Sequence, residues 1–289
     1  MTLEWIVDGS ESNQRLGTFV QTKLEGNQST KQVKRWIEGN RCQVNGVTER
    51  FASRPVKKGD RVSFQVPQEA TKTSHGSVIF EDDDLVVYNK SAGETSEALI
   101  KRLERNHGDL GLVHRLDKDT GGVIVFARNN LTKKRMEDLF RERAVSKTYL
   151  ALVDGIPSDR KGLIQSYLGK ISSYEGQTTY GSVPEAHGLY AETAWECLQR
   201  GSEAALIACY PKTGRTHQLR VHLKELGTPI LGDYQYARGQ NTTFRALRQM
   251  LHAWKIAFVW NGNPVEFVAP LPDDFLRTAR AFKVDIKNS

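Results

Sequence analysis

The polar loop that contains Asp117 has the residue types needed for nucleophilic chemistry. Residues 123–127 are apolar and β-branched, which predicts a buried strand after the loop, and residues 111–113 predict the end of another before it. Such flanks would hold the loop at the edge of a core. We expect a carboxylate next to Arg115 and Lys118 to be ionised at neutral pH. An ionised and positioned aspartate can act as a nucleophile.

Two other interpretations of the same loop remain open. Its Asp-Lys-Asp-Thr-Gly-Gly run is also ordinary turn chemistry, which would make the loop structural. Alternatively, Asp117 and Asp119 could be the paired carboxylates of a glycoside hydrolase, which must flank one glycosidic bond. Residues two apart on a loop rarely present carboxylates at that separation, so hydrolysis is the weaker hypothesis.

A second polar segment, residues 211–233, combines cationic side chains with a helical pattern. Its Gly-Arg-Thr start predicts a turn that feeds a helix, with Arg215, His217 and Gln218 in the first turn and Arg220 just after it. A helix N-terminus with added Arg and His side chains favours anions. The next histidine lies five residues after His217, not three or four, so a helical zinc pair is not indicated.

Composition gives a moderate preference for a polyanionic partner. The 289 residues carry a formal net charge of +7, which favours nucleic acid. Three dispersed cysteines indicate neither a disulfide framework nor a CxxC metal site. There is no signal-peptide pattern and no apolar run of membrane-spanning length, so we expect a cytoplasmic protein that needs neither a metal nor a cofactor.

The chain is expected to contain two domains. Residues 11–67 predict a small unit with two short helices, the second basic, followed by strand pieces around an Asn-Gly turn. Residues 68–76 are polar and aperiodic and are interpreted as a linker. Residues 77–289 form the second domain, which opens with a predicted hairpin over 78–90 and continues with a helix over 131–143 and a strand over 147–155.

The motifs of the second domain resemble those of the RluA-type pseudouridine synthases. The resemblance is carried by His-Arg-Leu-Asp-x-x-Thr-x-Gly at 114–122, Lys-x-Tyr-x-Ala-x-Val-x-Gly at 147–155, Gly-Arg-Thr-His-Gln-Leu-Arg-Val-His-Leu at 214–223 and Ala-Pro-Leu-Pro at 269–272. It implies an α+β fold, with a mixed, mostly antiparallel sheet and a central cleft. Residues 11–67 are similar to the αL RNA-binding module that often precedes such domains.

The resemblance also implies roles for individual residues. Asp117 is the catalytic aspartate, Arg220 pairs with it and keeps it charged, and Tyr149 lies by the target base. Arg115 is a candidate to fill the space that a flipped base leaves. The remaining residues expected to bind substrate are His114, Arg215, His217, Gln218 and Leu251 in the second domain, and Arg15, Lys34 and Arg35, facing RNA phosphates, in the first.

The implied reaction converts uridine to pseudouridine in structured RNA, by a monomer that does not bind membranes. Large-subunit ribosomal RNA is the first expectation and transfer RNA the second. The chain departs from the family's wording at Ser91, at Gly121 and in the segment 260–264, and it lacks the customary Val-His-Pro. These departures support one alternative, a catalytically silent RNA-binding assembly factor with the same fold.

Overall fold

The computed structural model describes residues 2–24, 28–38, 40–66, 76–174, 177–233, 235–237, 246 and 248–286. The chain divides into two compact units, Met1–Thr73 and Ser74–Ser289. The linker predicted at 68–76 lies outside the described residues, apart from Gly76. In the described part of the chain, no helix is long and apolar enough to cross a membrane.

The first unit is a small sheet covered by two helices. The strand order is β1 (Thr2–Ile6), β4 (Arg61–Gln65), β2 (Cys42–Val44) and β3 (Val47–Thr48), and the helices are α1 (Leu16–Lys23) and α2 (Thr30–Glu38). Asn45 and Gly46 turn between β2 and β3 with φ of 56° and 78°, as the Asn-Gly pair predicts. Strand β1 lies before the predicted 11–67 module. It was not predicted from the sequence, because β1 is held in the sheet by pairing with β4, which is distant in sequence.

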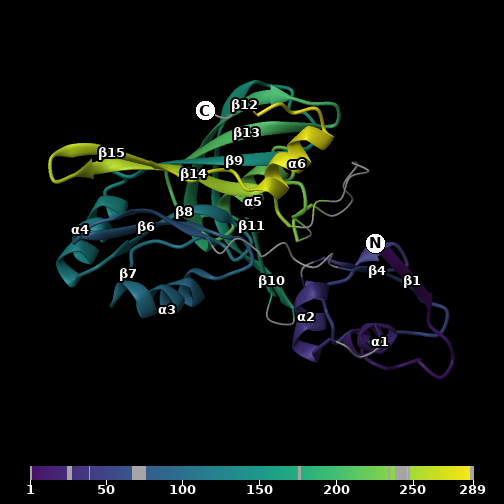
Figure 1. The fold of residues 1–289 in the computed structure, drawn as a ribbon. Helices are drawn as coiled ribbons and strands as arrows, with labels where there is room; N and C mark the ends of the chain where they lie inside the picture. The colour runs from purple at the N-terminus through teal and green to yellow at the C-terminus, as the bar shows by residue number, and fades with distance from the viewer. Residues whose placement is uncertain are drawn as a thin grey trace. The chain divides into compact units, whose positions relative to one another are not determined.

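The second unit is organised around a long mixed sheet (Figure 1). Within the described residues its order is β11 (Gln177–Ser182), β10 (Lys161–Tyr174), β12 (Leu189–Arg200), β13 (Ala204–Pro211), β9 (Ser146–Asp154), β14 (Leu251–Trp260), β8 (Gly121–Ala127), β6 (Leu85–Lys90) and β5 (Ser77–Glu81), with β15 (Asn263–Val268) beside β14 and β7 (Gly111–Leu112) beside β8. All of these pairs are antiparallel except β14 with β8. The predicted α+β class is confirmed.

The parallel pair of β8 and β14 brings the aspartate loop against the middle of the sheet. His252 lies opposite Gly121 and Ala253 opposite Gly122. Gly122 has a φ of 114°, and a Cβ there would lie 2.1 Å from the Ala253 carbonyl oxygen, so no other residue fits. The end of the 111–122 segment is therefore fixed next to Leu251, the first residue of β14.

In the described part of this unit, four α-helices accompany the sheet: α3 (Ser96–His107), α4 (Asn130–Arg141), α5 (Gln218–Glu225) and α6 (Asp273–Ala281). Helix α5 begins later than predicted, at Gln218, so Arg215 and His217 precede the helix instead of lying in its first turn. His217 is the N-cap residue and has a left-handed backbone, with φ of 57°. A positive φ is uncommon for a residue with a side chain, so His217 marks a distinct turn at the start of α5.

Candidate active site

Ser96 and Lys90 hold the backbone of the loop that carries Asp117. The Ser96 hydroxyl accepts the Leu116 N–H at 3.0 Å. The buried Lys90 Nζ donates to the Lys118 carbonyl at 3.2 Å and to two carbonyls of its own turn. Burial lowers the pKa of Lys90 to about 8, against the charges of the nearby acids. The backbone on both sides of Asp117 is thus fixed by groups outside the loop.

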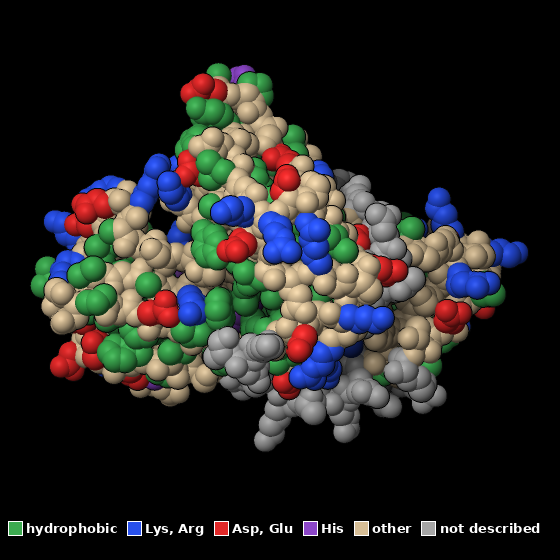
Figure 2. All heavy atoms as spheres, turned by 90° about the horizontal axis from the view of Figure 1, so that it is seen from above, with side chains coloured by type: hydrophobic (Ala, Val, Ile, Leu, Met, Phe, Trp, Pro, Cys, Tyr) green, Lys and Arg blue, Asp and Glu red, His purple; other side chains and the backbone are tan. Residues whose placement is uncertain are grey.

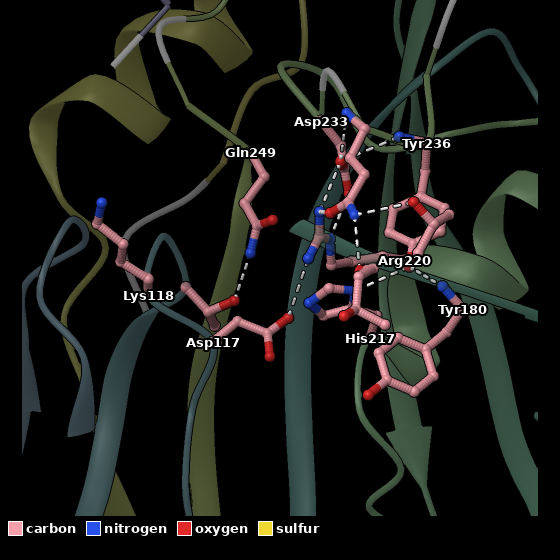
Figure 3. Close-up of polar contacts among 12 residues, drawn as sticks. Asp117, Lys118, Tyr180, His217, Arg220, Asp233, Tyr236 and Gln249 are labelled. Carbon is pink, nitrogen blue, oxygen red and sulfur yellow. Dashed lines mark hydrogen bonds and ion pairs between the residues drawn. The ribbon is translucent and has the colours of Figure 1, made fainter. Parts of the chain in front are cut away.

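The other end of the loop is attached to β14. Asp117 to Thr120 form a turn, in which the Thr120 N–H donates to the Asp117 carbonyl at 3.1 Å. The buried Gln249 amide donates to the Thr120 hydroxyl at 2.6 Å, across 129 residues of sequence (Figure 3). Gln249 lies two residues before Leu251, the first residue of β14. The aspartate and this apolar wall are therefore positioned together.

Arg220 lies between two carboxylates, Asp117 and Asp233 (Figure 3). Its Nη1 is 3.5 Å from Asp117 Oδ2, while Nε and Nη2 donate to the two Asp233 oxygens at 2.6 and 2.9 Å. Gln235 accepts a further Nη2 bond at 2.9 Å, and the Tyr236 ring lies 4.7 Å from the guanidinium carbon. Burial opposes the charge of Arg220, but Asp233 outweighs it, so the pKa is raised.

Asp117 and Arg220 line a cavity of about 110 Å³. Tyr149 and Leu251 come from the neighbouring strands β9 and β14, where Tyr149 pairs with Ala253. The cavity's other lining residues are Arg115, Leu116, Thr120, Lys147, Pro211, Thr213, Gly214, Arg215, Thr216, His217, Gln218 and Leu219. The structure thus brings together Asp117, Tyr149, Arg220 and Leu251, from four separate segments.

Burial sets the proton affinities around this cavity. It raises the pKa of Tyr149, with a smaller contribution from the charge of Asp117, so the phenol is neutral at neutral pH. Burial lowers the pKa of Lys147 to about 8, and the Lys147 Nζ donates to the Thr213 carbonyl at 3.3 Å. Burial and the charge of Arg220 lower the pKa of His217 to about 4. At neutral pH the cavity therefore combines the neutral phenol of Tyr149 and the neutral imidazole of His217 with the cationic side chains of Lys147, Arg115, Arg215 and Arg220.

His114 is placed differently from its prediction as a substrate-binding residue. It is outside the cavity lining. Its Nε2 accepts the Val125 N–H at 3.0 Å, and its ring packs on Phe140 with centroids 4.9 Å apart. Burial lowers the pKa of His114 to about 3. The side chain therefore supports the loop from behind, by joining it to β8.

Gln218 lines the cavity, but its amide is fully used by protein groups. Its Oε1 accepts the Thr213 hydroxyl at 2.7 Å and the Arg215 N–H at 3.0 Å. Its Nε2 donates to the Glu192 carbonyl and the Thr193 hydroxyl at 3.0 and 2.9 Å. An amide has two donors and one oxygen acceptor, so Gln218 holds the turn before α5 and has no donor left for substrate.

Arg115 and Arg215 line the same cavity, but their side chains are restrained to different degrees. The Arg115 side chain is 72% exposed, and its nearest acid, Glu97, is 3.8 Å away. Arg215 is half-buried, and its Nε donates to the Tyr190 carbonyl at 2.9 Å. Arg115 can therefore move to follow a substrate, while Arg215 is held in place.

The structure describes two of the three cationic side chains that are predicted to bind RNA in the first unit. Arg15 is exposed and is the N-cap residue of α1. Lys34 is exposed on α2, with Glu38 3.9 Å from its Nζ. The side chain of Arg35 lies outside the described part of the structure. The αL assignment of this unit stays a prediction.

Sequence reasoning missed several residues that shape the site. Asp233 was visible in the Gly-Asp that ends residues 227–233, but nothing in the sequence showed which cation it meets. Lys147 is the first residue of the motif at 147–155, where a lysine predicts an exposed strand position. Gln249 and Tyr236 lie in a segment without periodicity. Their roles depend on contacts between distant segments, which spacing alone does not show.

Comparisons with known proteins agree with this geometry. A family model described as RNA pseudouridylate synthase matches residues 67–225. An RNA pseudouridine synthase of Bacillus subtilis, named as uncharacterised, is 30% identical over 288 residues, covering 91% of this chain and 92% of the relative. The ribosomal large subunit pseudouridine synthase D of Borreliella burgdorferi is 32% identical over 255 residues, covering 78% and 76%.

A solved structure shows the same fold. The human protein RNA pseudouridylate synthase domain containing 1 superposes with a TM-score of 0.64 at 28% identity, covering 75% of this chain and 89% of the human chain. The motif resemblance at 114–122, 147–155 and 214–223 is thus confirmed at the level of the family. The chain belongs to the RluA-type RNA pseudouridine synthases, a family of isomerases.

Proposed function

We propose that this enzyme isomerises uridine in large-subunit ribosomal RNA, with Asp117 as the catalytic carboxylate. The observation that carries the proposal is the Asp117–Arg220 pair, 3.5 Å apart, in a cavity that Tyr149 and Leu251 also line. Arg220 places a permanent positive charge beside this carboxylate. Each available mechanism uses the Asp117 carboxylate, whether it attacks C1′ of the ribose, attacks C6 of uracil or removes a sugar proton.

The isomerisation breaks the N1–C1′ bond and joins C5 to C1′. The hydrogen on C5 is lost to solvent, and N1 gains a proton. Uracil must leave the base stack to enter the cavity. Because the pKa of Tyr149 is raised, its neutral phenol is a poor base in the resting site. We assign Tyr149 to packing against the base, with Leu251 on the adjacent strand.

Cations around the cavity are suited to hold the RNA backbone. Arg115, which lines the cavity, is 72% exposed. Lys212, which lies between the lining residues Pro211 and Thr213, is 68% exposed and pairs with Glu192 at 3.0 Å. On the face shown in Figure 2, Lys and Arg side chains are spread among acidic and hydrophobic ones instead of forming one band. Phosphate contacts give affinity without reading sequence. We therefore propose that RNA shape at the target selects the uridine, aided by the Met1–Thr73 unit as an RNA-binding module.

Ribosomal RNA is favoured over transfer RNA because the Borreliella relative is named a ribosomal large subunit pseudouridine synthase. We propose that the enzyme acts as a monomer. We place this activity in the cytoplasm, where newly made ribosomal RNA is available.

The test is tritium release from uracil C5 in unmodified large-subunit ribosomal RNA, small-subunit ribosomal RNA and transfer RNA. Release from the large-subunit RNA alone supports the proposal. Release from transfer RNA alone overturns the substrate assignment and keeps the reaction. Binding to RNA without release from any of them favours the assembly-factor alternative.

A further inference from the structure

The hydroxyl of Tyr236 connects the cavity to the backbone of strand β11. Its oxygen lies 2.7 Å from His217 Nδ1 and 2.9 Å from the Tyr180 backbone nitrogen. Tyr236 is buried, 4% exposed. The His217 ring makes edge contacts with both tyrosine rings, with centroids 5.4 Å from Tyr180 and 5.5 Å from Tyr236. The imidazole is thus held by aromatic packing and by one hydroxyl.

The direction of the two hydrogen bonds follows from the donors. A backbone N–H can only donate, so the Tyr236 oxygen accepts from Tyr180. The Tyr236 hydroxyl hydrogen then requires an acceptor, because a buried unpaired donor is costly. His217 Nδ1 is the acceptor within 2.7 Å. A nitrogen that accepts carries no hydrogen, so the ring proton of the neutral His217 is on Nε2.

The position of Nε2 relates this tautomer to the reaction. Figure 3 shows the His217 ring between Tyr236 and Asp117, with one nitrogen directed at Tyr236 and the other edge toward the Asp117 side. His217 lines the cavity together with Asp117 and Tyr149. Neutrality of the ring is consistent with its burial beside the Arg220 cation, which lowers the pKa of His217.

We propose that Tyr236 is a positioning residue that fixes His217 as the Nε2–H tautomer, so that His217 donates to a carbonyl oxygen of the uracil in the cavity. This inference rests on the proposed function, because it takes the flipped uridine as the occupant. A single fixed donor matches uracil, whose exocyclic groups are both carbonyls, and opposes an amino group at the same position. Tyr236 therefore acts through His217, and His217 contacts the base.

The first measurement is the tautomer of His217 in the full-length protein. Nitrogen-15 spectra of histidine-labelled protein distinguish the two tautomers, and His217→Gln identifies the His217 signals among the 7 histidines. We expect an Nε2–H pattern in the wild type and a loss of that single pattern in Tyr236→Phe. The Tyr236→Phe ring still packs on Arg220, so only the hydroxyl is removed. An Nδ1–H pattern in the wild type overturns the proposal.

The second measurement compares amide replacements of His217. A Gln amide nitrogen is as far from Cβ, in bonds, as Nε2, and an Asn amide nitrogen as far as Nδ1. We expect His217→Gln to retain about tenfold more single-turnover activity than His217→Asn. Backbone strain would give the opposite order, because Asn adopts the left-handed conformation at φ 57° more readily. Equal losses, or better activity in His217→Asn, contradict a donor at Nε2.

Tyr236→Phe should lower the single-turnover rate about tenfold while RNA affinity, set mainly by phosphate contacts, stays unchanged. Tyr167→Phe is the matched control, since its hydroxyl bonds Glu185 on the surface. It should leave the rate unchanged. A wild-type protein that releases no tritium overturns the proposed function. Release by the wild type, with a normal rate in Tyr236→Phe, overturns the Tyr236 inference alone.

Discussion

Asp233 binds Arg220 through both carboxylate oxygens, at 2.6 and 2.9 Å, and so fixes the guanidinium in the active site. Asp117, which we propose as the catalytic aspartate, contacts only Nη1 of Arg220, at 3.5 Å. The Asp233 side chain is 1% exposed, whereas that of Asp117 is 27% exposed. One carboxylate is therefore structural and the other accessible to substrate, although both face the same cation.

Asp233→Asn should destabilise the protein and impair the reaction. The variant leaves Arg220 buried with half of its counter-charge removed, and breaking a buried pair costs about 3–5 kcal/mol. Chemical denaturation measures the loss. Asp274→Asn is the matched control, because Asp274 forms a similar two-bond pair with Arg248 but is 39% exposed. It should cost about 1 kcal/mol, and equal losses in the two variants would contradict the assignment.

Gly121→Ser should stabilise the active-site loop. Gly121 stands where the family motif has Ser or Thr, and a Cβ there would lie 3.2 Å from the Lys90 carbonyl oxygen and 3.4 Å from His252 Nδ1. That buried nitrogen has no hydrogen-bond partner among the described residues, while Nε2 of the same ring bonds the Ala269 carbonyl. A serine hydroxyl would supply the missing donor, worth about 1 kcal/mol. Gly121→Ala adds the Cβ alone, so equal stability of the Ser and Ala variants would refute this explanation.

Gln249→Leu should lower kcat more than it changes KM. The substitution removes the 2.6 Å bond that holds Thr120, and with it the loop that carries Asp117. A misplaced catalytic group costs turnover even where substrate binding is intact. Thr120→Val removes the other partner of the same bond. The double variant should therefore lose less than the sum of the two single losses, and strict additivity would show that the bond does not position the loop.

Most of the fold and the central residues of the site could be predicted from the sequence, because both depend on local patterns. The hairpin of β5 and β6, the helix α4 and the strand with Tyr149 follow from apolar periodicity, and they lie close to the predicted ranges. The resemblance to the family's motifs identified Asp117 and Arg220 as site residues, and the structure brings them together. The tasks of His114 and Gln218 did not follow from their motifs, since only the three-dimensional contacts show that their polar groups are occupied.

RNA affinity should fall as pH rises from about 7 to about 9, and Lys147 should account for part of this fall. Burial lowers the pKa of Lys147 to about 8, so the amine is mostly charged below that pH and mostly neutral above it. Its attraction for phosphate is lost in the same range. Lys147→Arg keeps its charge throughout and Lys147→Met never has one. Both should bind RNA with weaker pH dependence than the wild type, and three parallel curves would exclude Lys147.

The most direct test of the account is tritium release from uracil C5 by Asp117→Asn beside Asp119→Asn, in the RNA that the wild type modifies. Each variant replaces one loop carboxylate by an amide of the same shape. We predict no measurable release by Asp117→Asn with RNA binding retained, and release within a few-fold of wild type by Asp119→Asn. Release by Asp117→Asn, or its loss only in Asp119→Asn, would contradict the assignment of Asp117 as the catalytic aspartate.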